Sequence, residues 1–166
     1  MDTVAALAQA LDAVGADYAQ LESGSFAVQL PGQRRLKTTC WLIVGDHAVQ
    51  IEAFVVRRPD ENVDGVHAFL LQRNPRMYAV AWSIDAAGDI YLSGHLPFSA
   101  ISPEEVDRVL GAVLEYADGT FNTLLELGFG SSIRREWAWR VKRGESLANL
   151  AAFADFVERT STPSGA

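Results

Sequence analysis

The chain has 166 residues, of which 49% are hydrophobic and 21% are charged, and its net charge is −7. This length suits one domain with a single core, and the acidic balance argues against a general nucleic-acid binder, whose affinity comes mostly from cations that neutralise phosphates. No apolar run approaches the roughly 20 residues of a membrane span. The single cysteine, Cys40, excludes an intramolecular disulfide and predicts a reducing, cytoplasmic location.

A helix and two short strands are predicted at the start of the chain. Apolar residues recur at helical spacing over residues 3–14, and Gly15 can end this helix in a left-handed conformation. Residues 18–21 and 26–30 then suit short strands, because turn-forming residues separate them.

The strongest strand signal is a hairpin, residues 38–44 and 47–57, around the dipeptide Gly45-Asp46. A two-residue turn with glycine first suits type II′ and predicts that Val44 lies opposite His47. One face of the hairpin is apolar and is expected to form the core: Cys40, Leu42, Val44, Val49, Ile51, Ala53 and Val55. The other face is mixed: Trp41, Ile43, Ala48, Gln50, Glu52, Phe54 and Val56.

This mixed face is the first candidate interaction surface. It is too apolar for free water and too polar for a deep core, and surfaces of this kind often meet a partner. The residues that we assign to a partner or dimer interface are Trp41, Ile43, Gln50, Glu52 and Phe54. The alternative is that a helix of the same chain covers this face.

A second helix and a second hairpin follow. Residues 63–73 carry an apolar stripe that ends at Asn74-Pro75, because the residue before a proline is pushed out of the helical region. Residues 77–96 then form a hairpin that we expect at the centre of the scaffold. Its first arm alternates, with one large apolar face made by Tyr78, Val80, Trp82 and Ile84.

The last third of the chain is predicted to be helical. Ser102-Pro103 starts a helix over residues 104–127, which Asp118-Gly119 can kink and Gly128-Phe129-Gly130 ends. Residues 131–143 are compatible with a helix, and residues 147–157 form a last amphipathic one.

These elements predict an α+β fold, an antiparallel β-sheet with helices on one face. The expected order is α-β(β)ββ-α-ββ-α plus a C-terminal helix, because consecutive strands joined by short turns pair antiparallel. We expect a single domain over residues 1–158 and a disordered tail over residues 159–166.

No residue pattern predicts catalysis, and we expect no catalytic residue, metal or cofactor. The three histidines have no zinc-binding spacing, and no GxSxG motif presents a nucleophilic serine. The segment Gly128-Phe129-Gly130-Ser131-Ser132 resembles a phosphate loop, but it follows a helix and lacks the lysine of that motif. The amides of residues 131–133 could hold an anion, although a helix stop with a serine cap also explains them.

A cluster of basic residues lies near the C-terminus. Arg134, Arg135 and Arg140 are our candidates for contact with an anion or an acidic partner. The alternative is a solvated helix face with some ion pairs.

Short motifs after residue 57 resemble one known family. They are Arg58-Pro59-Asp60-Glu61, Leu70-Leu71-Gln72-Arg73-Asn74, Tyr78-Ala79-Val80-Ala81, Gly88-Asp89-Ile90-Tyr91-Leu92, and Asp118 with Phe121. As a set, over about residues 37–140, they resemble the YbjN-domain family. The segments Leu127-Gly128-Phe129, Ser132-Ile133 and Arg135-Glu136-Trp137-Ala138-Trp139-Arg140 resemble its actinobacterial branch. The N-terminal helix lies outside the matched segments.

The resemblance implies a fold similar to type III secretion chaperones, usually a homodimer, and a regulatory or chaperone-like role in sensory transduction without catalytic residues. We therefore expect a non-enzymatic protein-interaction module that binds itself and an unidentified protein partner, but no nucleic acid or membrane. The alternative is a sensor domain that binds a small ligand or an anion.

Overall fold

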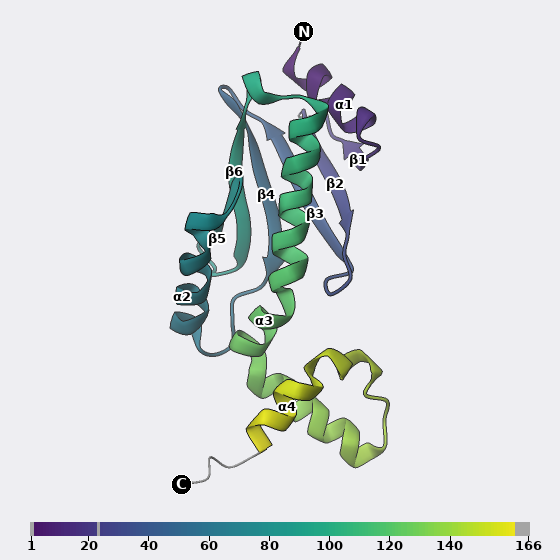
Figure 1. Cartoon of the computed structure of the whole chain (residues 1–166), viewed down its shortest axis with the longest axis vertical. Helices are drawn as coiled ribbons and strands as arrows, with labels where there is room; N and C mark the ends of the chain where they lie inside the picture. Colours follow the sequence, from purple (N-terminus) through teal and green to yellow (C-terminus); the bar gives the residue numbers. More distant parts are fainter. Residues whose placement is uncertain (1, 23, 162–166) are drawn as a thin grey trace.

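Six strands and four α-helices make up the described part of the chain, residues 2–22 and 24–161, in this computed structural model (Figure 1). In chain order they are α1 (Thr3–Ala13), β1 (Asp17–Gln20), β2 (Ser25–Pro31), β3 (Lys37–Val44), β4 (Ala48–Val56), α2 (Val63–Arg73), β5 (Val80–Ile84), β6 (Ile90–Pro97), α3 (Pro103–Arg143) and α4 (Ala154–Ser161). Short 3-10 helices η1 (Asn74–Arg76), η2 (Phe98–Ala100) and η3 (Ala148–Phe153) connect them. The α+β class and the element order are confirmed.

The strands form one antiparallel sheet in the order β1-β2-β3-β4-β6-β5. The predicted centre of the scaffold was wrong, because the β5–β6 hairpin lies at one edge and β3 and β4 lie in the middle. β6 pairs with both β4 and β5, so β5 is the edge strand on this side of the sheet. Either arm of a hairpin can pair with the rest of a sheet. The choice depends on the path of the preceding helix, and the alternation of apolar residues along a strand does not reveal that path.

The turn between β3 and β4 is longer than predicted. Val44 lies opposite Val49 instead of His47, and the amide of Gly45 donates to the carbonyl of Ala48 at 3.0 Å. A type II′ turn needs a positive φ at its first central residue, and Gly45 is not among the residues with positive φ. The pairing is shifted by two residues, and since side chains alternate with a period of two, both predicted faces are preserved.

β5 is shorter than the predicted arm. Ala79 has a φ of 63°, which interrupts the strand after Tyr78, so that Tyr78 and Ile84 are 43% and 50% exposed rather than buried. The side chain of Asn74 blocks the outer edge of β5, since it accepts from the amide of Trp82 at 2.7 Å and donates to its carbonyl at 3.2 Å. Capping an edge strand in this way disfavours pairing with another chain.

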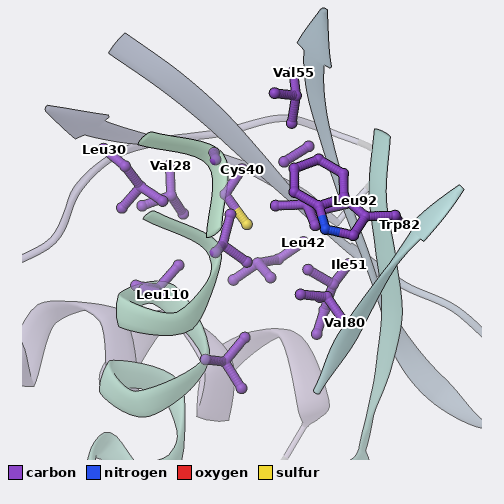
Figure 2. Packing of buried hydrophobic residues seen from close by; sticks show 14 of the residues in the cluster. Val28, Leu30, Cys40, Leu42, Ile51, Val55, Val80, Trp82, Leu92 and Leu110 are labelled. Carbon is purple, nitrogen blue, oxygen red and sulfur yellow. The ribbon is translucent and has the colours of Figure 1, made fainter. Parts of the chain in front are cut away.

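The core lies between one face of the sheet, which we call the inner face, and helices α1, α2 and α3 (Figures 1 and 2). Figure 2 shows Leu110 of α3 beside side chains from several strands. The apolar face predicted for β3 and β4 is confirmed as this core face: Cys40, Leu42, Val49, Ile51, Ala53 and Val55 are at most 1% exposed, and Val44 packs against them. Burial of such aliphatic side chains is the main source of stability.

Helix α3 spans 41 residues in two helical segments that meet at a kink at Phe129, whose φ of −137° and ψ of 20° are not helical. The first segment therefore ends at residues 128–130, as predicted, and a second segment follows directly, whereas the predicted kink at Asp118-Gly119 was wrong. The loop before α2 supplies hydrogen bonds to the backbone groups that the kink leaves without helical partners. The amides of Asp60 and Glu61 donate to the carbonyl of Gly128, and the Glu61 carboxylate accepts from the Ser131 amide at 2.6 Å and from its hydroxyl at 2.8 Å.

The residues after this kink, 130–161, form a helical arm, which we call the terminal arm. It contains the rest of α3, then η3 and α4, and both of these contact α3 (Figure 1). The single predicted helix over residues 147–157 is in fact a 3-10 turn followed by α4. α4 continues to Ser161, further than the predicted start of a tail at residue 159, and residues 162–166 lie outside the described residues.

Candidate protein-interaction surface

All five residues predicted for a partner interface lie on one face of the sheet, opposite the core, which we call the outer face. Trp41 lies opposite Glu52 and Ile43 lies opposite Gln50 on the paired strands β3 and β4. Helices α1 and α2 and the part of α3 before the kink place their buried side chains on the inner face. Trp41 and Phe54 therefore remain 37% and 39% exposed. The alternative of a covering helix has no support among the described residues.

The pairing of β4 with β6 brings further residues to the outer face that the sequence analysis did not include. Tyr91 lies opposite Phe54, and their rings make an edge-to-face contact with centroids 5.6 Å apart. Ser93 lies opposite Glu52, and its hydroxyl is 2.7 Å from that of Ser83. Alternation along residues 90–97 already separates Tyr91 and Ser93 from the core, but only the sheet order joins them to Trp41.

A basic hollow of about 620 Å³ lies at the end of the outer face where β3 begins and β4 ends. Its lining is Arg34, Arg35, Leu36, Lys37, Phe54, Val55, Val56, Arg57 and Phe121, with no acidic residue. The Arg35 guanidinium lies near the rings of Phe54 and Phe121, 5.9 and 5.8 Å from their centroids, and donates to the Val55 carbonyl at 3.0 Å. Partial burial lowers the pKa of Arg35, as expected for a charge removed from water.

The loop that carries these cations is held by one partly buried carboxylate on α3. Asp118 accepts from the amides of Arg34 and Arg35 at 2.7 and 2.9 Å. Burial of this carboxyl acts to raise its pKa, but the loop amides and the Arg34 charge outweigh burial and lower the pKa overall. Gly32 is required here, since an added Cβ at this position would lie 2.5 Å from the Asp118 oxygen. The core helix therefore fixes the basic end of the outer face.

An acidic hollow of about 260 Å³ lies on the other side of the Phe54–Tyr91 pair. It is lined by Glu52, Ser83, Ile84, Asp85, Tyr91 and Ser93. The pKa of Tyr91 is raised, first by burial and then by the charges of Asp85, Asp89 and Glu52. The three carboxylates therefore surround one phenol, and the outer face has opposite charges at its two sides.

The three arginines predicted to contact an anion do not line one hollow, although the charges of Arg134 and Arg135 both act on the Glu61 carboxylate. Arg134 lies over the Phe156 ring at 4.4 Å and lines a hollow of about 860 Å³ between α3 and α4. Arg135 lines a separate hollow of about 450 Å³ and donates to Ser132 at 3.1 Å. Arg140 lines neither of these hollows; it pairs with Glu136 at 2.7 Å and donates to the Ser146 carbonyl at 2.9 Å.

The amide predicted as an anion site also has a partner. The amide of Ser131 binds the Glu61 carboxylate, as described above, and these hydrogen bonds lower the pKa of Glu61. The phosphate-loop pattern at residues 128–132 is thus a kinked helix whose new N-terminal end is capped by a carboxylate of the same chain.

Reactive groups are scarce in the described residues. They contain no group of three histidine, cysteine or acidic side chains that could hold a metal ion. Cys40 is fully buried, and burial raises its pKa to about 12, which keeps the thiol protonated and unreactive. No described helix combines the length and the apolarity needed to cross a bilayer.

The model of the YbjN family, described as "Putative bacterial sensory transduction regulator", matches residues 3–126 of the chain. The chain belongs to the YbjN family. The matched region starts at α1, which the motif resemblance had wrongly left outside, and it ends just before the kink of α3.

Relatives within mycobacteria agree with the actinobacterial branch. The chain is 61% identical over 127 residues to the uncharacterized protein Mb0497 of Mycobacterium bovis, covering 76% of this chain and 69% of the relative. It is 56% identical over 131 residues to the uncharacterized protein ML2442 of Mycobacterium leprae, covering 79% and 71%.

Solved structures show that this YbjN family member has a type III secretion chaperone-like fold. A chain of the HopA1–SchA chaperone–effector complex matches with a TM-score of 0.52 at 12% identity, covering 69% of this chain and 89% of that one. A chain of the Yersinia pestis chaperone SycH complex with a fragment of YscM2 also has a TM-score of 0.52 at 12% identity, covering 70% and 97%. The ExsC–ExsE complex matches similarly, with a TM-score of 0.52 at 17% identity, covering 73% and 92%.

Proposed function

We propose that the protein is a non-enzymatic protein-interaction module with a chaperone-like or regulatory role, and that it acts in the cytoplasm as a homodimer joined through the outer face. The observation that carries this proposal is a central sheet face with two partly exposed aromatic residues and no covering helix in the described part of the chain. Aromatic residues are enriched at protein interfaces, where they contribute much of the binding energy. The structural neighbours, which were solved in complex with protein partners, also support a role in protein binding.

Size-exclusion chromatography with light scattering tests the dimer. We expect a mass of twice the 18.1 kDa of the chain at micromolar concentration, and a folded monomer for Trp41→Glu, because a carboxylate buried between two faces lacks a partner. Leu71→Glu is the matched control, since Leu71 is 64% exposed on α2, a helix whose buried side chains belong to the core. A monomeric wild-type protein contradicts the homodimer, and a Leu71→Glu monomer contradicts the choice of face.

A protein partner is the second element of the proposal. Pull-down from a native lysate with the wild-type protein and with Trp41→Glu should identify proteins retained by the first and lost with the second.

Domain limits of residues 1–158 remain part of the proposal, although α4 itself continues to Ser161.

The alternative of a small-ligand or anion sensor has less support from the geometry. Arg134 and Arg135 line different hollows, and the amide of Ser131 already binds Glu61. A thermal-shift series with inorganic phosphate tests this alternative, because a ligand that binds the folded state raises the unfolding temperature. We expect no shift.

A further inference from the structure

The charges of the outer face are separated into two groups. The basic rim is Arg34, Arg35, Lys37 and Arg57, around the hollow at the start of β3. The acidic rim is Glu52, Asp85 and Asp89, around Tyr91. Phe54 and Tyr91 lie between the rims and contact each other through their rings. One side of this aromatic centre is therefore positive and the other side negative.

Two cations of the basic rim have no acidic partner among the described residues. Arg34 pairs with Asp118 at 3.9 Å, and Arg57 pairs with Asp60 at 2.6 Å. In contrast, the Arg35 side chain donates to the carbonyls of Val55 and Lys37 and to the Thr38 hydroxyl. The Lys37 side chain is on an exposed residue and forms no ion pair in the described part of the chain.

The carboxylates of the acidic rim are bound mainly by backbone amides and one side-chain amide, and the charge of Arg57 interacts with that of Asp89. Asp85 accepts from the amides of Ala87 and Asp89 within its own turn, and Asp89 accepts from the amide of Arg58 at 2.8 Å. Glu52 accepts from the Gln50 side chain at 2.5 Å. No ion pair to these three carboxylates occurs within the described ranges, 2–22 and 24–161.

We propose that the second copy in the homodimer packs outer face to outer face about a two-fold axis close to Phe54, so that the basic rim of each copy meets the acidic rim of the other. This inference rests on the proposed function and adds the orientation of the interface. In a two-fold interface, a contact from one residue to another is made twice, once in each direction. A face that is positive on one side of its centre and negative on the other is therefore complementary to itself.

The overall charge favours this arrangement. Two copies with a net charge of −7 each repel one another at long range. A face of uniform sign would add to that repulsion, whereas opposed rims lower it and fix the relative orientation of the copies. Salt screens exposed charges over about 10 Å at 0.1 M, so a rise in ionic strength weakens both the repulsion between the copies and the attraction between the rims.

Charge reversal at one residue of each rim tests the orientation. Lys37→Glu places like charges at both symmetric contacts, and so does Glu52→Lys. We expect each variant alone to raise the dimer dissociation constant by about tenfold or more in low salt, since facing like charges are strongly unfavourable. Glu52 is preferred to Asp85 for this test, because the Asp85 carboxylate also holds its turn.

An equimolar mixture of the two variants is the decisive measurement. In the mixed dimer, Glu at position 37 faces Lys at position 52, while the native Glu52 faces the native Lys37, so both contacts become attractive again. Sedimentation velocity should therefore show dimers in the mixture but not in either variant alone. Lys142→Glu, the same substitution on an exposed residue of the terminal arm, is the control and should leave the dimer unchanged.

The outcomes separate this inference from the proposed function. Recovery of dimers in the mixture supports the orientation. Variants that remain dimeric alone, or a mixture that remains monomeric, overturn the orientation while a Trp41→Glu monomer still supports the proposed interface. A wild-type protein that is monomeric overturns both.

Discussion

Consecutive residues of β3 and β4 belong to two surfaces with opposite roles. On the inner face, Leu42 and Ile51 are 1% and 0% exposed and contact only other apolar groups of the core. On the outer face, Trp41 and Phe54 remain more than one-third exposed beside polar side chains. The same two strands thus supply both the core and the proposed interface, since neighbouring residues in a strand point to opposite sides of a sheet.

The largest effect that this comparison predicts is on folding stability. Ile51→Ala should lower the free energy of unfolding by about 2–5 kcal/mol, because it removes apolar contacts and leaves a cavity. Gln50→Ala, on the adjacent outer-face residue, should change it by only about 0.5 kcal/mol. Urea unfolding of both variants in the Trp41→Glu background measures the fold without association. Equal losses would show that the outer face is also part of the core.

A smaller effect is expected at Asp118, which connects the two faces. Asp118→Asn should lower the free energy of unfolding by about 1–3 kcal/mol, because a charged acceptor for the loop amides is lost. The folded-state pKa of Asp118 is lowered, so its contribution is present above the unfolded pKa of about 3.9 and is lost as pH falls through the folded value. In urea unfolding, the difference in unfolding free energy between Asp118→Asn and the wild type should be present at pH 7 and shrink at pH 2–3. A difference that is the same at both pH values contradicts this role.

Thiol labelling compares the accessibility of the faces directly. Cys40 on the inner face should not react with a maleimide or a disulfide reagent at pH 8 in the native protein, since it is buried and its pKa is about 12. The variant Ser93→Cys should react on the outer face, and more slowly in the dimer than in the Trp41→Glu background. Native labelling of Cys40 at the rate of the denatured protein would refute the separation of the faces.

The smallest effect is expected at Glu61, which belongs to neither face. Glu61→Gln should leave the dimer and the core intact and increase hydrogen exchange at the start of the terminal arm, near Ser131. Hydrogen bonds from Ser131 lower the pKa of Glu61, so its contribution is present above the unfolded pKa of about 4.3 and is lost as pH falls through the folded value. After correction for the pH dependence of intrinsic exchange rates, the hydrogen exchange of the wild type near Ser131 should approach that of Glu61→Gln in acid. Unchanged exchange in Glu61→Gln would show that the kink does not need this cap.

Much of the local structure follows from short-range patterns. The bounds of α2 at residues 63–73 agree with the prediction, and so does the division of β3 and β4 into two faces. The errors and omissions arose where distant segments decide. The break at Phe129 was predicted from the Gly-Phe-Gly sequence, but its cap, Glu61, comes from about 70 residues earlier in the chain.

The candidate surface was only partly predictable for the same reason. Alternation placed Trp41 and Phe54 together, because both lie on one hairpin. Tyr91 joined them through the pairing of β4 with β6, which depends on where α2 returns the chain to the sheet. Arg134, Arg135 and Arg140 are close in sequence, but Arg140 pairs with Glu136 while the charges of Arg134 and Arg135 act on Glu61, a residue that only the fold brings near them.

The sequence by itself determined the α+β class, the core face of the central hairpin, the family and the five outer-face residues, because periodicity and motifs are local properties of a chain. The strand order, the capping of the α3 kink by Glu61, and the two charged rims on either side of Phe54 and Tyr91 became visible only in the folded chain. The physical reason is that each of these depends on contacts between segments far apart in sequence, whose free energies local periodicity does not encode.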